Sequence, residues 1–148
     1  MSMDVMLKYK VVNEDERGEI SVLFEPEDED KKDIAILRTN RGFARGGCVH
    51  NINNEICIVI KGIIQYYTDT DLDKPFSSTF LKHKLEKGDK ILVEKNTVHY
   101  YISLTDSIVI EWGATLPEKL EKHPETRKIV EMINKKMEEK KHEKNKST

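Results

Sequence analysis

The sequence predicts an all-β domain of short antiparallel strands, closed into a sandwich or barrel and followed by a C-terminal α-helix. Short runs rich in β-branched and aromatic residues recur up to about residue 116, with turn signals between them and no helical pattern among them. Beyond Pro117 the sequence becomes charged and helical. A chain of 148 residues has the size of one ordinary domain, so we expect a barrel over residues 1–116 and a helical extension with a frayed tail over residues 117–148.

Alternation of apolar and polar side chains places the strands. Ile20 and Val22 alternate with Ser21, as a half-buried strand requires, and glycines at positions 62 and 88 mark turns between such runs. By the same alternation we expect His83 to point inward and Trp112 to belong to a core-facing stripe. The expected strands span residues 7–12, 19–24, 33–39, 48–51, 55–61, 63–68, 78–85, 90–94, 98–104 and 107–113.

A helix is expected from Pro124 to about residue 141. Val130, Ile133 and Met137 recur at helical spacing and form one narrow apolar stripe. We expect this stripe to pack on the barrel or on a partner subunit.

Composition excludes several classes of function. The 25 basic and 27 acidic side chains give a net charge of −2, which argues against a nucleic-acid partner. The sequence contains no apolar run long enough to span a membrane and no secretory pattern at its start. Two cysteines are too few for a disulfide scaffold and suit a reducing compartment, so we expect a cytoplasmic protein.

Chemically active side chains concentrate in residues 41–62 and 88–99. Cys48 and His50 are two residues apart on an expected strand, so both point to one face. Glu55 opens the next apolar run, and His99 begins a later strand. If the sheet closes, these four side chains converge inside it, where cysteine, histidine and carboxylate groups bind zinc, iron, nickel or copper. The structural alternative is a turn carboxylate, a hydrogen-bonded barrel histidine and a small core cysteine.

The spacing of these residues resembles the two motifs of the cupin superfamily. The first motif is represented by Gly42, Cys48, His50, Glu55 and Gly62, and the second by Gly88, Glu94, Asn96 and His99. The spacing matches throughout, whereas Cys48, Glu94 and Asn96 stand where the family usually has His, Pro and Gly. Asparagine, like glycine, tolerates a left-handed turn. The resemblance implies a double-stranded β-helix, or jelly-roll barrel, with Cys48, His50, Glu55 and His99 as candidate metal ligands.

A narrower resemblance covers about residues 15–112. Asp15-Glu16-Arg17-Gly18, followed by Arg45-Gly46-Gly47-Cys48-Val49-His50, looks like the cupins that act on nucleotide-linked sugars, the deoxythymidine-diphosphate-4-keto-sugar 3,5-epimerases and 3,4-ketoisomerases. In those families a base removes a proton next to the sugar ketone, and a tyrosine usually assists as the acid. The resemblance also implies a homodimer, through the strand at residues 7–12 or through the helix stripe.

The narrower resemblance assigns expected roles residue by residue. Arg45 would orient polar sugar or diphosphate oxygens. Cys48 stands at the position of the base, and His50 takes over that role unless the thiolate is stabilised. Tyr101 and Tyr67 are the candidate acids. The expected catalytic residues are therefore His50, Cys48 and Tyr101, and the expected substrate-binding residues are Arg45, Tyr67 and His83.

Three functions follow from these residues. The leading hypothesis is proton abstraction next to the carbonyl of a nucleotide-linked keto-sugar, with no obligatory cofactor. The second is a metal-dependent dioxygenase or isomerase, in which Cys48, His50, Glu55 and His99 hold a divalent metal (Zn, Fe, Ni or Mn). The third is a non-catalytic cupin that binds a sugar or sugar-nucleotide and has lost the base.

Overall fold

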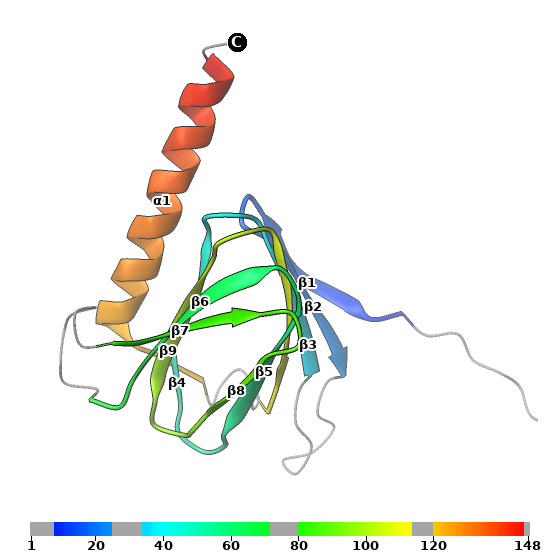
Figure 1. Ribbon diagram of the computed structural model, residues 1–148, viewed down its shortest axis with the longest axis vertical. Coiled ribbons are helices and arrows are strands. Elements are labelled where there is room, and N and C mark those ends of the chain that lie inside the picture. Colours follow the sequence, from blue (N-terminus) through cyan, green and yellow to red (C-terminus); the bar gives the residue numbers. More distant parts are fainter. Residues whose placement is uncertain (1–7, 25–33, 72–79, 114–119, 147–148) are drawn as a thin grey trace, which may run out of the picture.

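The computed structural model describes residues 8–24, 34–71, 80–113 and 120–146, which form two facing antiparallel sheets with one helix outside them (Figure 1). The six-stranded sheet has the order β1-β2-β3-β10-β5-β8, and the five-stranded sheet has the order β11-β4-β9-β6-β7. The elements are β1 (Lys10–Asp15), β2 (Gly18–Phe24), β3 (Ile34–Thr39), β4 (Ala44–His50), β5 (Glu55–Lys61), β6 (Ile63–Asp69), β7 (Leu81–Glu86), β8 (Lys90–Val93), β9 (Val98–Ser103), β10 (Ser107–Trp112), β11 (Leu120–Lys122) and α1 (Pro124–Lys146). The expected all-β fold class is confirmed.

Every expected strand has a counterpart, with shifted bounds at some ends. β1 begins at Lys10, later than expected, and β4 begins at Ala44, before the expected start at residue 48. The expected strand residues 7, 33, 78 and 79 lie outside the described residues. β11 was not expected, and it pairs with β4 through residues that follow Pro117. The five-stranded sheet therefore includes residues that we had assigned to the helical extension.

The main core lies between the sheets. Its fully buried members include Val59, Ile64, Tyr66 and Val109, each at most 1% exposed. On β10, however, Val109 faces this core and Trp112 is 47% exposed, so the expectation that Trp112 packs in the core is wrong. β10 carries apolar residues on both faces, and alternation alone therefore does not say which face turns inward.

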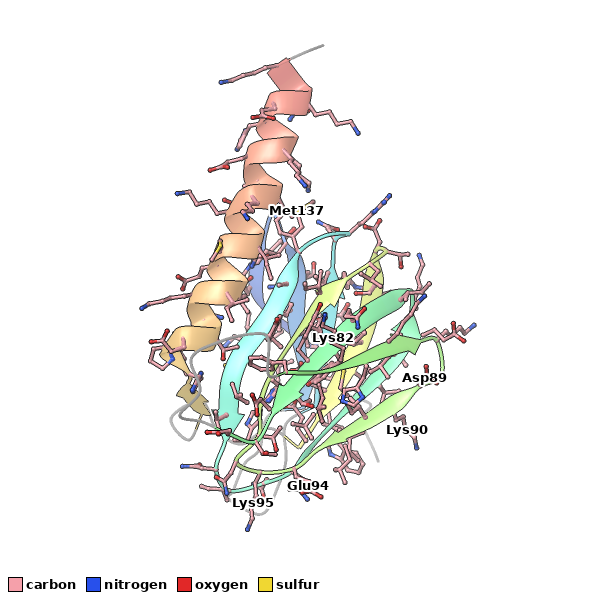
Figure 2. The ribbon with its side chains drawn as sticks, turned by 60° about the vertical axis from the view of Figure 1, so that its left-hand side comes forward. Lys82, Asp89, Lys90, Glu94, Lys95 and Met137 are labelled. Atoms are coloured by element: carbon pink, nitrogen blue, oxygen red, sulfur yellow. The ribbon has the colours of Figure 1, made fainter. Side chains whose placement is uncertain are left out.

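α1 packs against the outer face of the five-stranded sheet. Val130 is 1% exposed in a second apolar cluster, with Ile133 beside it, and Met137 lies on the side of α1 that faces the barrel (Figure 2). The apolar stripe of α1 therefore packs on the barrel, which is one of the two partners expected from the sequence. α1 continues to Lys146, beyond the expected end of the helix near residue 141. Within the described ranges, no helix is long and apolar enough to cross a membrane.

Polar contacts fix α1 to the backbone of β4. The Asn134 side chain accepts a hydrogen bond from the Ala44 N–H at 2.7 Å and donates one to the Ala44 carbonyl at 3.1 Å. Nη1 of Arg127 donates to the Gly46 carbonyl at 2.8 Å. The helix thus holds the strand that carries the first cupin-like motif.

Candidate functional site

A β-bulge in β4 decides which of its side chains face the interior. The pairing of β4 with β9 shifts between Gly46 and Cys48, which leaves Gly47 as the extra residue. Arg45 is paired with Tyr101 before the bulge, and Cys48 is paired with His99 after it. The extra residue reverses the inward–outward alternation of side chains along β4. Arg45, before the bulge, and Cys48, after it, therefore both face inward. His50, two residues beyond Cys48, faces inward as well. Without the bulge, Arg45 and His50 would lie on opposite faces.

Two imidazoles and one carboxylate meet inside the barrel. Nε2 of His50 lies 2.9 Å from Oε2 of Glu55, and Nε2 of His99 lies 3.7 Å from Oε1 of the same carboxylate. The two imidazole rings stack with centroids 5.2 Å apart. Glu55 is 1% exposed, so its carboxylate depends on these neighbours rather than on water for polar contacts.

His99 is held in one tautomer. Its Nδ1 lies 3.1 Å from the Thr97 carbonyl, so Nδ1 donates the hydrogen bond and the Nε2 lone pair faces Glu55. Burial lowers the pKa of His99, and the nearby carboxylate of Glu55 only partly offsets this. His99 is therefore neutral at neutral pH, which is the state that a metal ligand requires.

The turn of the second motif supports His50. Asn96 has a φ of +64°, the left-handed conformation that its place in the motif requires. Its backbone N–H donates to the His50 carbonyl at 2.8 Å. The two motifs are thus joined at the histidine of the first.

These residues fit a divalent metal ion. One ligand atom from each of His50, Glu55 and His99 lies within 4.8 Å of the other two, and all three residues are buried. Oε1 of Glu55 and Nδ1 of His50 are buried without a hydrogen-bond partner among the described residues. Imidazole and carboxylate donors suit zinc, iron, nickel or manganese.

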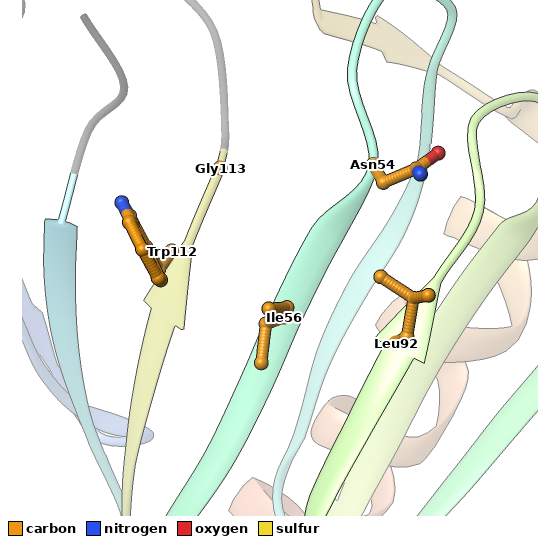
Figure 3. Close-up of a pocket in the computed structure, with 5 residues that line it drawn as sticks. All are labelled: Asn54, Ile56, Leu92, Trp112 and Gly113. Carbon is orange, nitrogen blue, oxygen red and sulfur yellow. The ribbon is translucent and has the colours of Figure 1, made fainter.

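The site opens into a cavity of about 230 Å³. Besides the two histidines and Glu55, its lining includes Arg17, Arg45 and Arg127 together with Glu111. Burial, followed by repulsion from Glu55, raises the pKa of Glu111 well above its usual range, although Arg45 partly offsets this shift. Glu111 therefore keeps its proton to a higher pH than an exposed carboxylic acid does. A second hollow, about 220 Å³ in volume and lined by Ile56, Leu92 and Trp112, lies on the outer face of the six-stranded sheet (Figure 3).

Comparison of the structure with solved structures finds similar proteins. The capsular polysaccharide assembling protein CapF from Staphylococcus aureus matches with a TM-score of 0.66 and 16% identity, over 79% of this chain and 33% of CapF. KdgF from Halomonas sp. matches with a TM-score of 0.54 and 18% identity, over 76% of this chain and 89% of that one. An RmlC-like cupin from Shewanella frigidimarina matches with a TM-score of 0.55 and 17% identity, over 75% and 87% of the two chains. This chain has the cupin fold.

The likeness concerns three-dimensional structure. No protein-family model matches the sequence, and no curated protein matches it either. The chain spans about a third of the length of CapF. The cupin fold that the motif spacing predicted is thereby confirmed.

Cys48 lies in the cavity but apart from the three side chains that fit a metal ion. Its sulfur is not among the ligand atoms that gather within 4.8 Å, so the expected set of four reduces to His50, Glu55 and His99. Burial raises the pKa of Cys48 to about 11, against which the charge of Arg127 has a smaller effect. Cys48 is thus a protonated thiol at neutral pH, and a protonated thiol is a poor proton acceptor, which favours His50 over Cys48 as the base.

Arg45 and Tyr101 belong to one buried network. The Tyr101 hydroxyl lies 3.1 Å from Oγ1 of Thr39, to which Nε of Arg45 donates a hydrogen bond at 3.3 Å. Nη1 of Arg45 is buried and has no hydrogen-bond partner in the described part of the chain. Tyr101 does not line the cavity, so its position suits holding Arg45 rather than donating a proton to a substrate.

Tyr67 and His83 do not reach the cavity. Tyr67, an expected substrate-binding residue, lies on the outer face of the five-stranded sheet, away from the cavity, and stacks on Tyr100 with centroids 4.5 Å apart. β6 turns Tyr66 inward instead, and Tyr67 follows it on the opposite face. His83 is half-buried on the edge strand β7, and its Nε2 lies 3.4 Å from Oγ1 of Thr68.

Sequence reasoning missed Glu111, Tyr66 and Arg127. Glu111 is a lone acid in the apolar run of β10, and such an interruption is a usable signal for a functional carboxylate. Tyr66 is fully buried, lies parallel to the His99 ring with centroids 6.1 Å apart, and has a buried hydroxyl without a partner among the described residues. Arg127 comes from α1, and no local pattern links this helix residue to a cavity whose other lining residues lie far from it in the sequence.

The buried acid Glu111 provides a prediction for the dependence of stability on pH. Its folded pKa is raised above its unfolded pKa, so it stabilises the protein below the unfolded pKa and this contribution is lost as pH rises through the folded pKa. We expect Glu111→Gln to raise Tm by a few degrees at pH 8 and to change it little at pH 4. Differential scanning calorimetry at both pH values measures this. A lower Tm for Glu111→Gln at pH 8 would show that the carboxylate is ionised and paired.

Proposed function

We propose that this cupin is an enzyme that removes and returns a proton next to the carbonyl of a sugar linked to a nucleotide diphosphate. The observation that carries the proposal is the buried pair of His50 and Glu55, in a cavity that three arginines also line. A histidine backed by a carboxylate is a common general base, and arginines suit the oxygens of sugars and phosphates. CapF, which shares this fold, is a capsular polysaccharide assembling protein, and this is consistent with sugar chemistry on the fold.

His50 is the proton acceptor in this proposal. Its Nε2 donates to Glu55 at 2.9 Å, so its Nδ1 carries the lone pair, and Nδ1 is the buried nitrogen without a hydrogen-bond partner. When Nδ1 takes the proton from the carbon next to the ketone, the carboxylate of Glu55 stabilises the imidazolium that forms. The negative charge that develops on the sugar oxygen is stabilised by the guanidinium of Arg45.

Return of the proton determines the product. If the same face of the carbon is protonated, the sugar is unchanged, and if the opposite face is protonated, the product is the epimer. Two groups whose pKa values are raised by burial line the cavity, Glu111 and the Cys48 thiol, and in this proposal one of them supplies the proton without help from a tyrosine.

Hydrogen exchange with solvent tests this function. The protein is incubated in deuterium oxide with a panel of nucleotide-linked 4-keto-sugars, and the proton next to the ketone is followed by NMR. Loss of that signal, faster than without protein, is the expected result. Binding of a sugar nucleotide without exchange would instead support a non-catalytic binding cupin.

A metal-dependent cupin is the second candidate, either a dioxygenase or an isomerase. It is favoured by the gathering of His50, Glu55 and His99 within 4.8 Å and by the unpartnered Oε1 of Glu55. When bound there, a divalent metal supplies Lewis-acid polarisation of a substrate oxygen. The three side chains would hold the metal, and Arg45 would still orient the substrate.

Metal analysis separates the two candidates. For protein purified without a histidine tag, the metal-dependent candidate predicts about one divalent ion per chain by elemental analysis, and much less in Glu55→Gln. Exchange activity that survives a strong chelator would support the metal-free mechanism. Activity that is lost on chelation and restored by one divalent ion would support the metal-dependent mechanism.

We also propose that the homodimer forms through the outer face of the six-stranded sheet. Ile60, Leu92 and Trp112 are exposed there by 43%, 57% and 47%, and Leu92 and Trp112 line the hollow of Figure 3. An apolar face pairs with itself across a two-fold axis, because the same patch is contributed by both copies. From strand spacing and length the sheet face covers roughly 500 Å², so two such faces together reach the total of about 1,000 Å² at which specific interfaces begin.

Light scattering after size-exclusion chromatography tests this interface. We expect the wild-type protein to run as a dimer and Trp112→Lys to run as a monomer, because a charge would be buried at the centre of the contact. Leu81→Lys is the matched control, since Leu81 is 66% exposed and belongs to the five-stranded sheet, outside the proposed interface. A Trp112→Lys variant that remains dimeric would exclude this face.

A further inference from the structure

We propose that Arg127 is a positioning residue of the candidate site. From the first turn of α1 it holds the β-bulge of β4, and through that bulge it keeps Arg45 and His50 pointed into the same cavity. Arg127 needs no contact with a substrate to do this, so the inference goes beyond the proposed function and applies to both of its candidates. It makes the C-terminal extension a part of the site rather than an attachment to the barrel.

The bulge is held by partners from the C-terminal segment. Gly46 and Gly47 have φ of +114° and +89°, a backbone conformation that glycine adopts without strain. The register of β4 and β9 skips Gly47, whose carbonyl accepts a hydrogen bond from the His123 N–H at 2.9 Å. The Gly46 carbonyl accepts one from Nη1 of Arg127 at 2.8 Å. Both carbonyls of the bulge are therefore bound by residues that follow the barrel, and one of them is bound by a charged donor.

Arg127 is itself fixed on the side of α1 that faces the barrel. Its backbone N–H donates to the His123 carbonyl at 2.9 Å, at the start of the helix. Its stem covers Gly47 so closely that an added Cβ there would lie 2.8 Å from Cδ of Arg127. Two turns further along α1, Asn134 is bonded to both backbone groups of Ala44. A guanidinium held in this way loses less entropy when it binds the bulge.

Without the contact from α1, Arg45 should lose its place in the cavity while His50 keeps its own. In a straight strand these two side chains lie on opposite faces, and the bulge brings them to one face. His50 is tied to Glu55 at 2.9 Å and, through its carbonyl, to the Asn96 N–H at 2.8 Å. Arg45 makes longer contacts, of which the one to Oγ1 of Thr39 measures 3.3 Å. Relaxation of the bulge should therefore move Arg45.

Nuclear magnetic resonance of the full chain tests this division. The buried Nε–H of Arg45 donates a hydrogen bond, so it should exchange slowly with water and give a resolved signal. In Arg127→Met that signal should shift or be lost, whereas the ring nitrogen signals of His50 should stay where they are. Lys128→Met is the matched control, because it removes the same charge from a side chain of α1 that is 73% exposed, and it should leave both signals unchanged.

Thiol labelling separates a loosened bulge from a destabilised fold. Cys48 directly follows the bulge, whereas Cys57 is fully buried in the core between the sheets. In Arg127→Met we expect alkylation of Cys48 to be about tenfold faster, the factor for one lost charge-assisted hydrogen bond, and alkylation of Cys57 to be unchanged. Peptide mass spectrometry measures both rates in one sample. Arg127→Lys, which keeps the stem and a charged donor, should restore most of the protection of Cys48.

Three results would overturn the role of Arg127. They are an unchanged Arg45 signal in Arg127→Met, equal effects of Arg127→Met and Lys128→Met, and a parallel rise in the labelling of both cysteines, which would mean that Arg127 stabilises the fold as a whole. These measurements use no substrate, so the proposed enzyme function can fail while the positioning role stands. If a keto-sugar does exchange, Arg127→Met should slow the exchange, and the double variant with Arg45→Met should be no slower than Arg45→Met alone, because Arg127 acts through Arg45.

Discussion

Replacing His50 with glutamine should lower the rate of solvent exchange next to the sugar ketone by about a thousandfold, the size typical of a lost general base. Glutamine can still donate to Glu55, which His50 contacts at 2.9 Å, so the cavity should keep its shape. What is removed is the nitrogen lone pair that accepts the proton. The measurement is the NMR exchange rate at saturating sugar nucleotide.

His142→Gln is the matched control for this prediction, because the His142 side chain is 67% exposed on α1 and should not affect exchange. His99→Gln separates the mechanisms further. In the metal-free mechanism, His99→Gln should lower the exchange rate much less than His50→Gln does. In the metal-dependent mechanism both histidines are ligands, so the two substitutions should lower the rate by about the same factor. Wild-type exchange in His50→Gln would exclude His50 as the base.

Gly47→Ala should destabilise the fold by about 2–4 kcal/mol. Gly47 has a φ of +89°, which strains any other residue, and an added Cβ would meet the side chain and backbone of Arg127. The barrel would therefore have to release the start of α1 or straighten the bulge. Urea unfolding followed by circular dichroism measures the loss.

Gly88→Ala distinguishes strain from crowding. Gly88 has a φ of +94°, but an added Cβ there has no neighbour within 4 Å, so only the backbone strain of about 1 kcal/mol should appear. If both substitutions lower the free energy of unfolding by the same amount, crowding against α1 adds nothing to the effect of Gly47→Ala. If Gly47→Ala also weakens binding of a sugar nucleotide, the bulge positions the cavity as well as the helix.

Motif spacing predicted the fold and most of the metal-binding group because these depend on strand length and turn position. Glu55 and His99 reach one point because Glu55 begins β5 and His99 is the second residue of β9, and Asn96 adopts the left-handed turn that its place in the motif demands. The role of Cys48 could not be predicted, since the pKa of a thiol depends on burial, which is a property of the whole barrel.

The errors have a common physical origin in strands that are apolar on both faces. β10 and β6 carry apolar or aromatic side chains in succession, so period-two alternation did not reveal that Trp112 and Tyr67 lie outside. The polar Glu111 was the better guide to the inward face of β10. Arg127 could not be found from sequence, because it reaches the cavity only when α1 docks on β4.

The attachment of α1 to β4 has a consequence for the motions of the protein. Asn134 is bonded to both backbone groups of Ala44, so the first turns of the helix cannot open without also freeing the strand that carries His50. Amide hydrogens in those turns should exchange together with the barrel, as one cooperative unit, and the exposed final turns should exchange independently. A ligand that enters between the sheets should therefore slow exchange in the first half of a helix that it touches only at Arg127.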